Sequence, residues 1–272
     1  MKHLCLAILF ASIIQTTLRA QDKPCTETCN NNIKHSYLSC IEDIINVGTV
    51  FTDLGREFFG GGVKVSFKDE FNAGEELLRE SKKKYTFINS GEKFQNLNSM
   101  LAKLVSKIQN RQGYTFNVYL IETDEINAWT CGGKIFFTTG IYNFCENNDE
   151  IASILGHEIS HNLLGHINSR LKDLKIANQF GIPGMLAAAV GMAATQSIGQ
   201  KNEAHSDLLG VDLVSAAGYK ICEAISLWKR MSEKSGDFNV LSNFLSSHPH
   251  PDKRAICIAN HIKTKYQLKC GN

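Results

Sequence analysis

The first clear pattern along the chain is a run of apolar residues at helical spacing between Glu92 and Arg111. Its members are Phe94, Leu97, Leu101, Leu104, Val105 and Ile108. Intervals of three and four residues place these side chains on one side of a helix, with polar residues on the other. The pattern therefore predicts an amphipathic helix over residues 92–111 that packs against a core.

A second apolar stripe follows two acidic residues near the middle of the chain. It consists of Ile151, Ile154, Leu155 and Ile159. The acidic pair before it, Asp149 and Glu150, suits the first turn of a helix because carboxylates there meet the positive end of the helix dipole. We therefore expect a buried helix that begins near residue 149 and runs through His161.

Two stretches have the pattern of β-strands. Residues 115–121 alternate between apolar and polar side chains, and residues 134–139 form a short apolar run bounded by glycines. Together with the helical patterns, they predict an α+β fold that is mostly helical, with a small β-sheet beside the helix that contains His157 and His161.

The residues between these two strands are expected to form an exposed strand edge. Asn127, Ala128 and Trp129 lie in this segment, and an extended peptide commonly binds such an edge by adding a further strand. An ordinary hairpin with a bend at Gly132 and Gly133 explains the same pattern equally well.

Length and charge narrow the class of protein. A chain of 272 residues is long enough for one large domain with a substantial core. Its formal net charge is only +2, which argues against nucleic acid as a main partner, since such proteins carry clustered positive charge.

Residues 1–20 have the features of a secretory signal peptide. A basic residue, Lys2, precedes an apolar run that is too short to span a membrane, and small and polar residues follow up to Ala20. We expect cleavage after Ala20 and a soluble mature chain that is secreted or periplasmic. The glycines at 60–62 mark the best boundary between a cysteine-containing N-terminal extension, residues 21–62, and a main domain, residues 63–272.

The cysteines agree with an exported chain. Those after residue 20 are Cys25, Cys29, Cys40, Cys131, Cys145, Cys222, Cys257 and Cys270. An even number in such a chain predicts disulfide bonds, although the sequence does not select the pairing. Zinc fingers are the less favoured alternative, because the spacing offers no second close pair.

Residues 181–199 have the length and much of the apolar character of a membrane span. Polar residues and Pro183 interrupt the stretch, so a packed helix or loop is favoured over a membrane span, and association with a membrane stays an open alternative.

The residues with the clearest chemistry are His157, Glu158 and His161. On a helix the two histidines stand one turn apart on the same face, so both imidazoles can bind one zinc ion. Glu158 can then take a proton from a water molecule and return it to a leaving amine. This is the HExxH pattern of zinc peptidases. Two core histidines bonded to backbone carbonyls are the alternative explanation.

A further helix is predicted to begin near Asn202, and it offers a third zinc ligand. Glu203 and Asp207 are four residues apart and share one face. We expect Glu203 to bind the metal and Asp207 to accept a hydrogen bond from a ligating histidine. His205 is the competing ligand, but it lies near the opposite side of the helix. An exposed first turn with solvated acidic residues is the ordinary alternative.

HExxH followed by Glu203 and Asp207 resembles the gluzincin metallopeptidases, and among them the group of HtpX, the CAAX prenyl endopeptidases and BepA. Further matching stretches are 127–140, His166, Gly210, 217–219, and 247–249 with Arg254. They cover residues 69 to 260 in the order of that group. Cys131 and His205 depart from its pattern without affecting the matched ligands.

The resemblance implies a zinc-dependent endopeptidase with one Zn²⁺ per chain, bound by His157, His161 and Glu203. Glu158 would be catalytic, and the substrates would be proteins or peptides, with protein quality control as one expected role. His248 is implied to lie near the metal, where we favour a donor to the oxyanion over a latch that binds the metal. The alternative function is a chaperone-like or binding protein that cleaves little.

Overall fold

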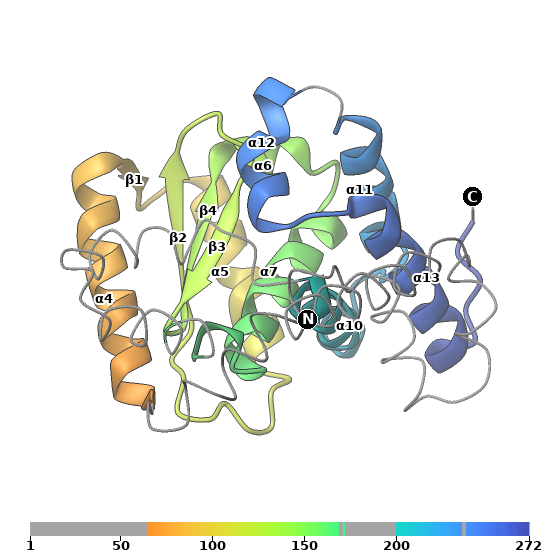
Figure 1. Ribbon diagram of the computed structural model, residues 1–272, viewed down its shortest axis with the longest axis horizontal. Coiled ribbons are helices and arrows are strands. Elements are labelled where there is room, and N and C mark those ends of the chain that lie inside the picture. The colour runs from red at the N-terminus through yellow and green to blue at the C-terminus, as the bar shows by residue number, and fades with distance from the viewer. Residues whose placement is uncertain (1–64, 169–170, 172–199, 236–237, 272) are drawn as a thin grey trace, which may run out of the picture. The chain divides into compact units, whose positions relative to one another are not determined.

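The computed structural model describes residues 65–168, 171, 200–235 and 238–271 (Figure 1). The predicted signal peptide, the N-terminal extension and the apolar stretch 181–199 lie outside the described residues.

Helices dominate the described chain, and a small sheet lies among them. The helices are α4 (Phe67–Lys84), α5 (Glu92–Val105), α6 (Thr139–Phe144), α7 (Asn148–Leu163), α10 (Gln200–Ala216), α11 (Glu223–Glu233), α12 (Phe238–Ser247) and α13 (Pro251–Tyr266). The strands are β1 (Thr86–Ile88), β2 (Asn117–Glu122), β3 (Ala128–Cys131) and β4 (Lys134–Thr138). Helix α7, which carries HExxH, packs against β3 and β4. The predicted fold class is therefore confirmed.

The four strands form a mixed sheet in the order β1-β2-β4-β3, with β2 and β4 parallel and the two outer pairs antiparallel. Figure 1 shows α4 on one side of this sheet and α5 and α7 on the other. Alternate side chains of β2 point to the two faces of the sheet. Val118 and Leu120 join the main core, whereas Tyr119 and Ile121 join a smaller core that includes Leu77 of α4.

The predicted helix over 92–111 begins where expected and ends earlier. Helix α5 stops at Val105, and the next turn is tightened by bonds to carbonyls three residues back. An Asx turn follows, in which the Gln112 amide donates to Asn110 Oδ1 at 2.9 Å. Ile108 still packs against the core, so the apolar spacing continued beyond the helix and concealed its end.

A tight turn at Gly132 and Gly133 joins β3 to β4. Both glycines have positive φ, +59° and +80°, as a two-residue hairpin turn of this type requires. A Cβ on Gly132 would lie 2.6 Å from the Glu70 carbonyl oxygen of α4. The turn therefore fits against α4 only because Gly132 lacks a side chain.

Strand β3 lies at the edge of the sheet, as predicted for the segment that contains Ala128, but its residues are not exposed. Asn127, Ala128 and Trp129 are all buried, because helices cover both faces of the edge strand. The expectation of an exposed segment was therefore wrong for the side chains, and the Trp129 ring stacks on Phe136 in the smaller core.

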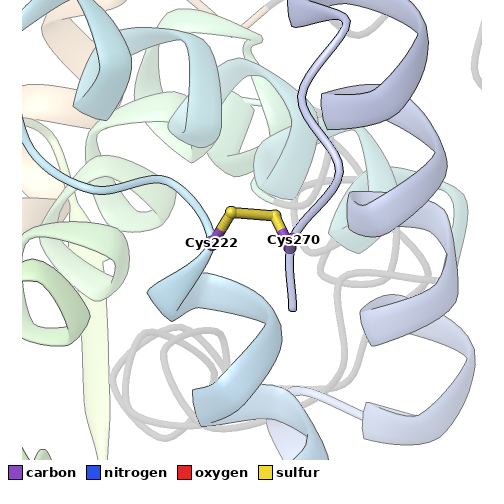
Figure 2. The surroundings of a disulfide bond; sticks show 2 residues. All are labelled: Cys222 and Cys270. Carbon is purple, nitrogen blue, oxygen red and sulfur yellow. A yellow bond between two sulfur atoms is a disulfide. The ribbon is translucent and has the colours of Figure 1, made fainter. Parts of the chain in front are cut away.

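One disulfide is present in the described residues. Cys222, at the start of α11, is bonded to Cys270 near the C-terminal end (Figure 2). Cys131 and Cys145 hold thiols instead, so the predicted disulfide bonds do not include these two. Burial raises the pKa of the Cys131 thiol to about 12, which keeps it protonated and unreactive. None of the described helices is both long and apolar enough to cross a membrane.

Candidate metal centre

Two helices that meet at glycines form the base of the site. A Cβ on Gly210 of α10 would lie 2.9 Å from the backbone nitrogen of His157 in α7. A Cβ on Gly156 would lie 3.0 Å from the Gly210 carbonyl oxygen. Because neither residue has a side chain, the helices approach closely enough for side chains on their facing sides to share one centre.

His157 and His161 of α7 meet Glu203 of α10 at this centre. The Nε2 atoms of the two histidines are 2.9 Å apart, and each lies 3.4 Å from a carboxylate oxygen of Glu203. His248, beyond the end of α12, places Nδ1 2.7 Å from Glu203 Oε2. In the described part of the chain these four residues are the group suited to hold a metal ion, with one donor atom of each within 4.8 Å of the others. All four are buried.

The donor atoms are of the types that bind zinc, and two of their spacings match it. Tetrahedral zinc with bonds of about 2.0–2.1 Å to nitrogen and oxygen places neighbouring ligand atoms about 3.3 Å apart. The two distances between Glu203 and the histidines are close to this value. Within the described residues, Oε1 of Glu203 accepts no hydrogen bond although it is buried. A buried carboxylate oxygen beside two imidazoles is therefore satisfied well by a cation.

Glu158 lies beside the four donors. The residue is 1% exposed, and its Oε1 likewise accepts no hydrogen bond from the described residues. Oε1 is 3.7 Å from His248 Nε2. Burial raises the pKa of the Glu158 carboxyl above its ordinary value, which increases its affinity for a proton. Such a carboxyl is suited to general base and acid chemistry.

Asp207 supports the centre from the same face of α10 as Glu203. Its Oδ1 is 3.0 Å from His157 Nδ1, the nitrogen opposite the one that faces Glu203. Arg254 of α13 binds Asp207 through two nitrogens, at 2.7 and 2.6 Å, and places Nη1 3.0 Å from Glu203 Oε2. The Arg254 guanidinium also lies over the ring of Trp228, 3.5 Å from its centroid. The protein groups alone therefore form the carboxylate–histidine arrangement that is typical of bound zinc.

The two histidines differ in their electrostatic surroundings. Burial and Arg254 disfavour a proton on His157, but hydrogen bonds with Asp207 and Glu203 outweigh them and raise the pKa of His157 to about 9. Positive charge is therefore favoured at this position, from a proton or from a metal ion. Burial lowers the pKa of His161 well below its usual range, so this imidazole is in the neutral form that binds metals.

Glu203 stays ionised despite its burial. Burial alone would raise the pKa of its carboxyl, but His248, His161 and Arg254 outweigh that effect and hold the pKa well below its ordinary value. The negative charge that a metal ligand needs is therefore maintained at a buried position.

His205 does not lie among the four donors, as its position on the helix predicted. Its ring instead stacks on His166, with 6.2 Å between centroids. The Nδ1 of His166 lies 3.2 Å from the Nδ1 of His161 and 3.2 Å from the Ser206 hydroxyl oxygen. His166 thus faces the nitrogen of His161 that does not point at the centre.

The edge strand lies close to the same centre. The Ala128 carbonyl oxygen is 3.4 Å from His248 Nε2, and it points away from β4 because the neighbouring Asn127 carbonyl accepts from Thr138. The structure therefore brings the backbone of Ala128 to the site. The side chains of its neighbours point elsewhere: Trp129 faces the smaller core, and the side-chain amide of Asn127 donates to Glu125.

Sequence reasoning missed two contributors. Asn162, directly after His161, joins α7 to β3 and the β3–β4 turn, and Trp228 lies under Arg254. Arg254 itself was noted only as part of a sequence signature. No local pattern marks these roles, because their partners in other elements are 26 to 97 residues away.

Comparison with known proteins agrees with this geometry. The chain is 25% identical over 225 residues to mitochondrial metalloendopeptidase OMA1 of Arabidopsis thaliana, covering 77% of the chain and 46% of that relative. It is 24% identical over 222 residues to the beta-barrel assembly-enhancing protease of Escherichia coli, covering 74% and 45%. It is also 24% identical over 194 residues to metalloprotease YcaL of Escherichia coli, covering 64% and 75%.

The chain spans about half the length of the first two of these relatives. The family model described as peptidase family M48 matches residues 92–261, a segment that holds the two helices of the metal centre and both His248 and Arg254. Since this match extends over more than half of the chain, the protein belongs to peptidase family M48.

Proposed function

We propose that the protein is a zinc-dependent endopeptidase that hydrolyses peptide bonds of protein substrates. The observation that carries this proposal is the buried Glu158 carboxylate, whose Oε1 accepts no hydrogen bond from the described residues and which lies beside a complete set of zinc ligands. A protein that only bound other chains would have no use for a costly buried carboxylate at this place.

Each residue of the site has a distinct task. His157, His161 and Glu203 hold the metal, and Asp207 keeps the His157 ring in the orientation that presents Nε2. When bound, zinc supplies a Lewis acid that makes water more acidic and polarises the peptide carbonyl. Glu158 accepts a proton from the attacking water and delivers it to the nitrogen of the leaving amine.

The outer edge of β3 is the proposed place for the substrate backbone. The Ala128 carbonyl faces away from β4 and towards the centre, so an extended peptide that pairs with this edge would bring a peptide bond beside Glu158. Backbone pairing does not require exposed side chains. The burial of Asn127 and Trp129 therefore leaves this role to the main chain.

His248 is proposed to donate a hydrogen bond to the oxyanion. Its Nδ1 faces Glu203, and its Nε2 faces two acceptors, the Ala128 carbonyl oxygen at 3.4 Å and Glu158 Oε1 at 3.7 Å. A ring nitrogen placed between the edge strand and the general base is well located to bind the oxygen of a carbonyl under attack.

The compartment is proposed to be extracellular or periplasmic, with residues 1–20 removed as a signal peptide. The Cys222–Cys270 disulfide supports an oxidising environment. Unfolded or misfolded proteins are the proposed substrates, in a quality-control role.

The function is tested on the mature chain, residues 21–272, produced in an oxidising compartment. We expect about one zinc per chain by elemental analysis and cleavage of unfolded casein that stops on addition of a zinc chelator and returns with zinc. Stoichiometric zinc without cleavage of casein or other unfolded chains would instead favour the chaperone-like alternative.

Substitution of His248 tests its role. His248→Ala is expected to lower kcat by about a hundredfold with zinc still bound, because one donor to the oxyanion is lost. The measurement is steady-state cleavage of a quenched fluorescent peptide together with zinc content. An increase in activity would identify His248 as a fourth ligand that occupies the position of the attacking water.

His250→Ala is the matched control for this measurement. His250 is the neighbouring histidine on the same turn, and its side chain is exposed. It should leave both kcat and zinc content unchanged.

A further inference from the structure

Asn162 makes an unusually complete set of hydrogen bonds for a residue that binds no metal. It follows His161 in α7 and is fully buried. Its Nδ2 donates to Thr130 Oγ1 at 2.8 Å and to the Glu158 carbonyl oxygen at 2.9 Å. Its Oδ1 accepts from the Gly133 amide at 2.9 Å. Both donor hydrogens and the acceptor oxygen are therefore in use.

These bonds join three parts of the site. Thr130 belongs to β3, Gly133 lies in the turn to β4, and the Glu158 carbonyl belongs to the turn of α7 that carries the general base. Thr130 Oγ1 in turn donates to the Lys134 carbonyl at 2.9 Å, so the connection reaches across the hairpin. One amide group thus links the general-base turn to both strands at the edge of the sheet.

Packing alone would not fix the position of the edge strand β3 relative to α7. Ala128, Leu155 and Ile159 belong to one apolar core, which holds α7 against the sheet. Apolar contact has no preferred direction, so it resists separation more than sliding. Hydrogen bonds of defined length and angle resist sliding as well.

We propose that Asn162 is a positioning residue. It fixes the position of the edge strand β3 along α7, and therefore relative to Glu158 and the metal ligands. The inference rests on the proposed function. A substrate peptide paired with β3 takes its position from the Ala128 carbonyl, so a slide of β3 along α7 moves the scissile bond away from the general base. Displacement of about 1 Å at a reacting centre can lower the rate by about a hundredfold.

Four single-residue variants of the full mature chain, and the double variant with Asn162→Leu and Thr130→Val, test the proposal. Asn162→Leu removes all three bonds at similar volume, and Thr130→Val removes only the acceptor on β3. Thr130→Ser keeps that hydroxyl and serves as the conservative rescue. Asn98→Leu is the matched control, because Asn98 of α5 also donates to the carbonyl four residues back, at 2.8 Å, but makes no hydrogen bond to another element among the described residues.

Three readouts separate positioning from general structure. Asn162→Leu should lower kcat about ten- to a hundredfold with little change in KM, keep about one zinc per chain, and speed hydrogen exchange of the Gly133 amide. Thr130→Val should lower kcat in the same direction, and the double variant should be no slower than Asn162→Leu. Thr130→Ser and Asn98→Leu should behave as wild type.

Loss of zinc together with activity in Asn162→Leu would overturn the proposal, since Asn162 would then support the ligand His161. Unchanged kcat, or additive effects in the double variant, would overturn it as well. If Asn162→Leu does not fold, Thr130→Val against Thr130→Ser still decides. If wild type cleaves nothing, the proposed function fails, and Gly133 exchange in Asn162→Leu separately reports whether the linkage exists.

Discussion

Glu158→Gln is expected to lower peptide hydrolysis by about a thousandfold, while zinc content and the thermal midpoint stay close to wild type. The amide has the shape of the carboxylate but takes up no proton from water, and transfer by a positioned group contributes about 10²–10⁴-fold. Folding should not suffer, because Oε1 of Glu158 accepts no hydrogen bond from the described residues. Cleavage of a quenched peptide, zinc analysis and thermal unfolding measure the three quantities.

Glu150→Gln is the matched control on the same helix. Glu150 is buried and bound by Arg230 through two contacts, one of them 2.9 Å long. Its amide should lower the thermal midpoint, since a buried ion pair is broken, yet leave kcat of the folded enzyme unchanged. Undiminished cleavage by Glu158→Gln would refute the mechanism, and loss of folding would make Glu158 a structural residue.

Glu203→Gln is expected to lose zinc. A neutral amide is a poor ligand, and the substitution also removes the negative charge that faces His157, His161 and Arg254. We expect zinc affinity to fall by about a hundredfold or more, judged from the smaller losses of about 10–100-fold when groups behind the ligands are changed. Competition with a chromophoric chelator measures the affinity, and circular dichroism verifies the fold.

His205→Gln should keep about one zinc per chain, because His205 stacks on His166 and lies outside the four donors. The opposite result, zinc retained in Glu203→Gln and lost in His205→Gln, would mean that the third ligand is misassigned.

The centre could be predicted from the sequence because its main parts obey helix geometry. A spacing of four residues places His157 with His161 on one face, and it does the same for Glu203 with Asp207. Those two relations need no knowledge of the rest of the fold. The order of the strands and the meeting of the helices at Gly156 are tertiary features, and no local spacing encodes them.

The predictions that were wrong also concern tertiary features, which local spacing does not encode. The end of α5 was placed too late because Ile108 packs on the core from outside the helix. Asn127 and Trp129 were expected on an exposed edge, but helices cover the faces of β3. Cys131 and Cys145 were expected in disulfides and hold thiols, since pairing depends on distances in the fold.

The dependence of the centre on Arg254 and His248 also sets the time at which the centre can form. During synthesis His157 is added to the chain before Arg254, and 97 residues separate the two. That separation corresponds to about 5–20 s at ordinary rates of synthesis. Glu203 and Asp207 are made midway through that interval and lack, until it ends, the guanidinium that holds them, and His248 is made only near its end. Over those 97 residues of synthesis the nascent chain therefore carries its HExxH helix without the groups that complete the proposed metal centre, so we expect zinc binding and any cleavage to begin only after Arg254 has been made.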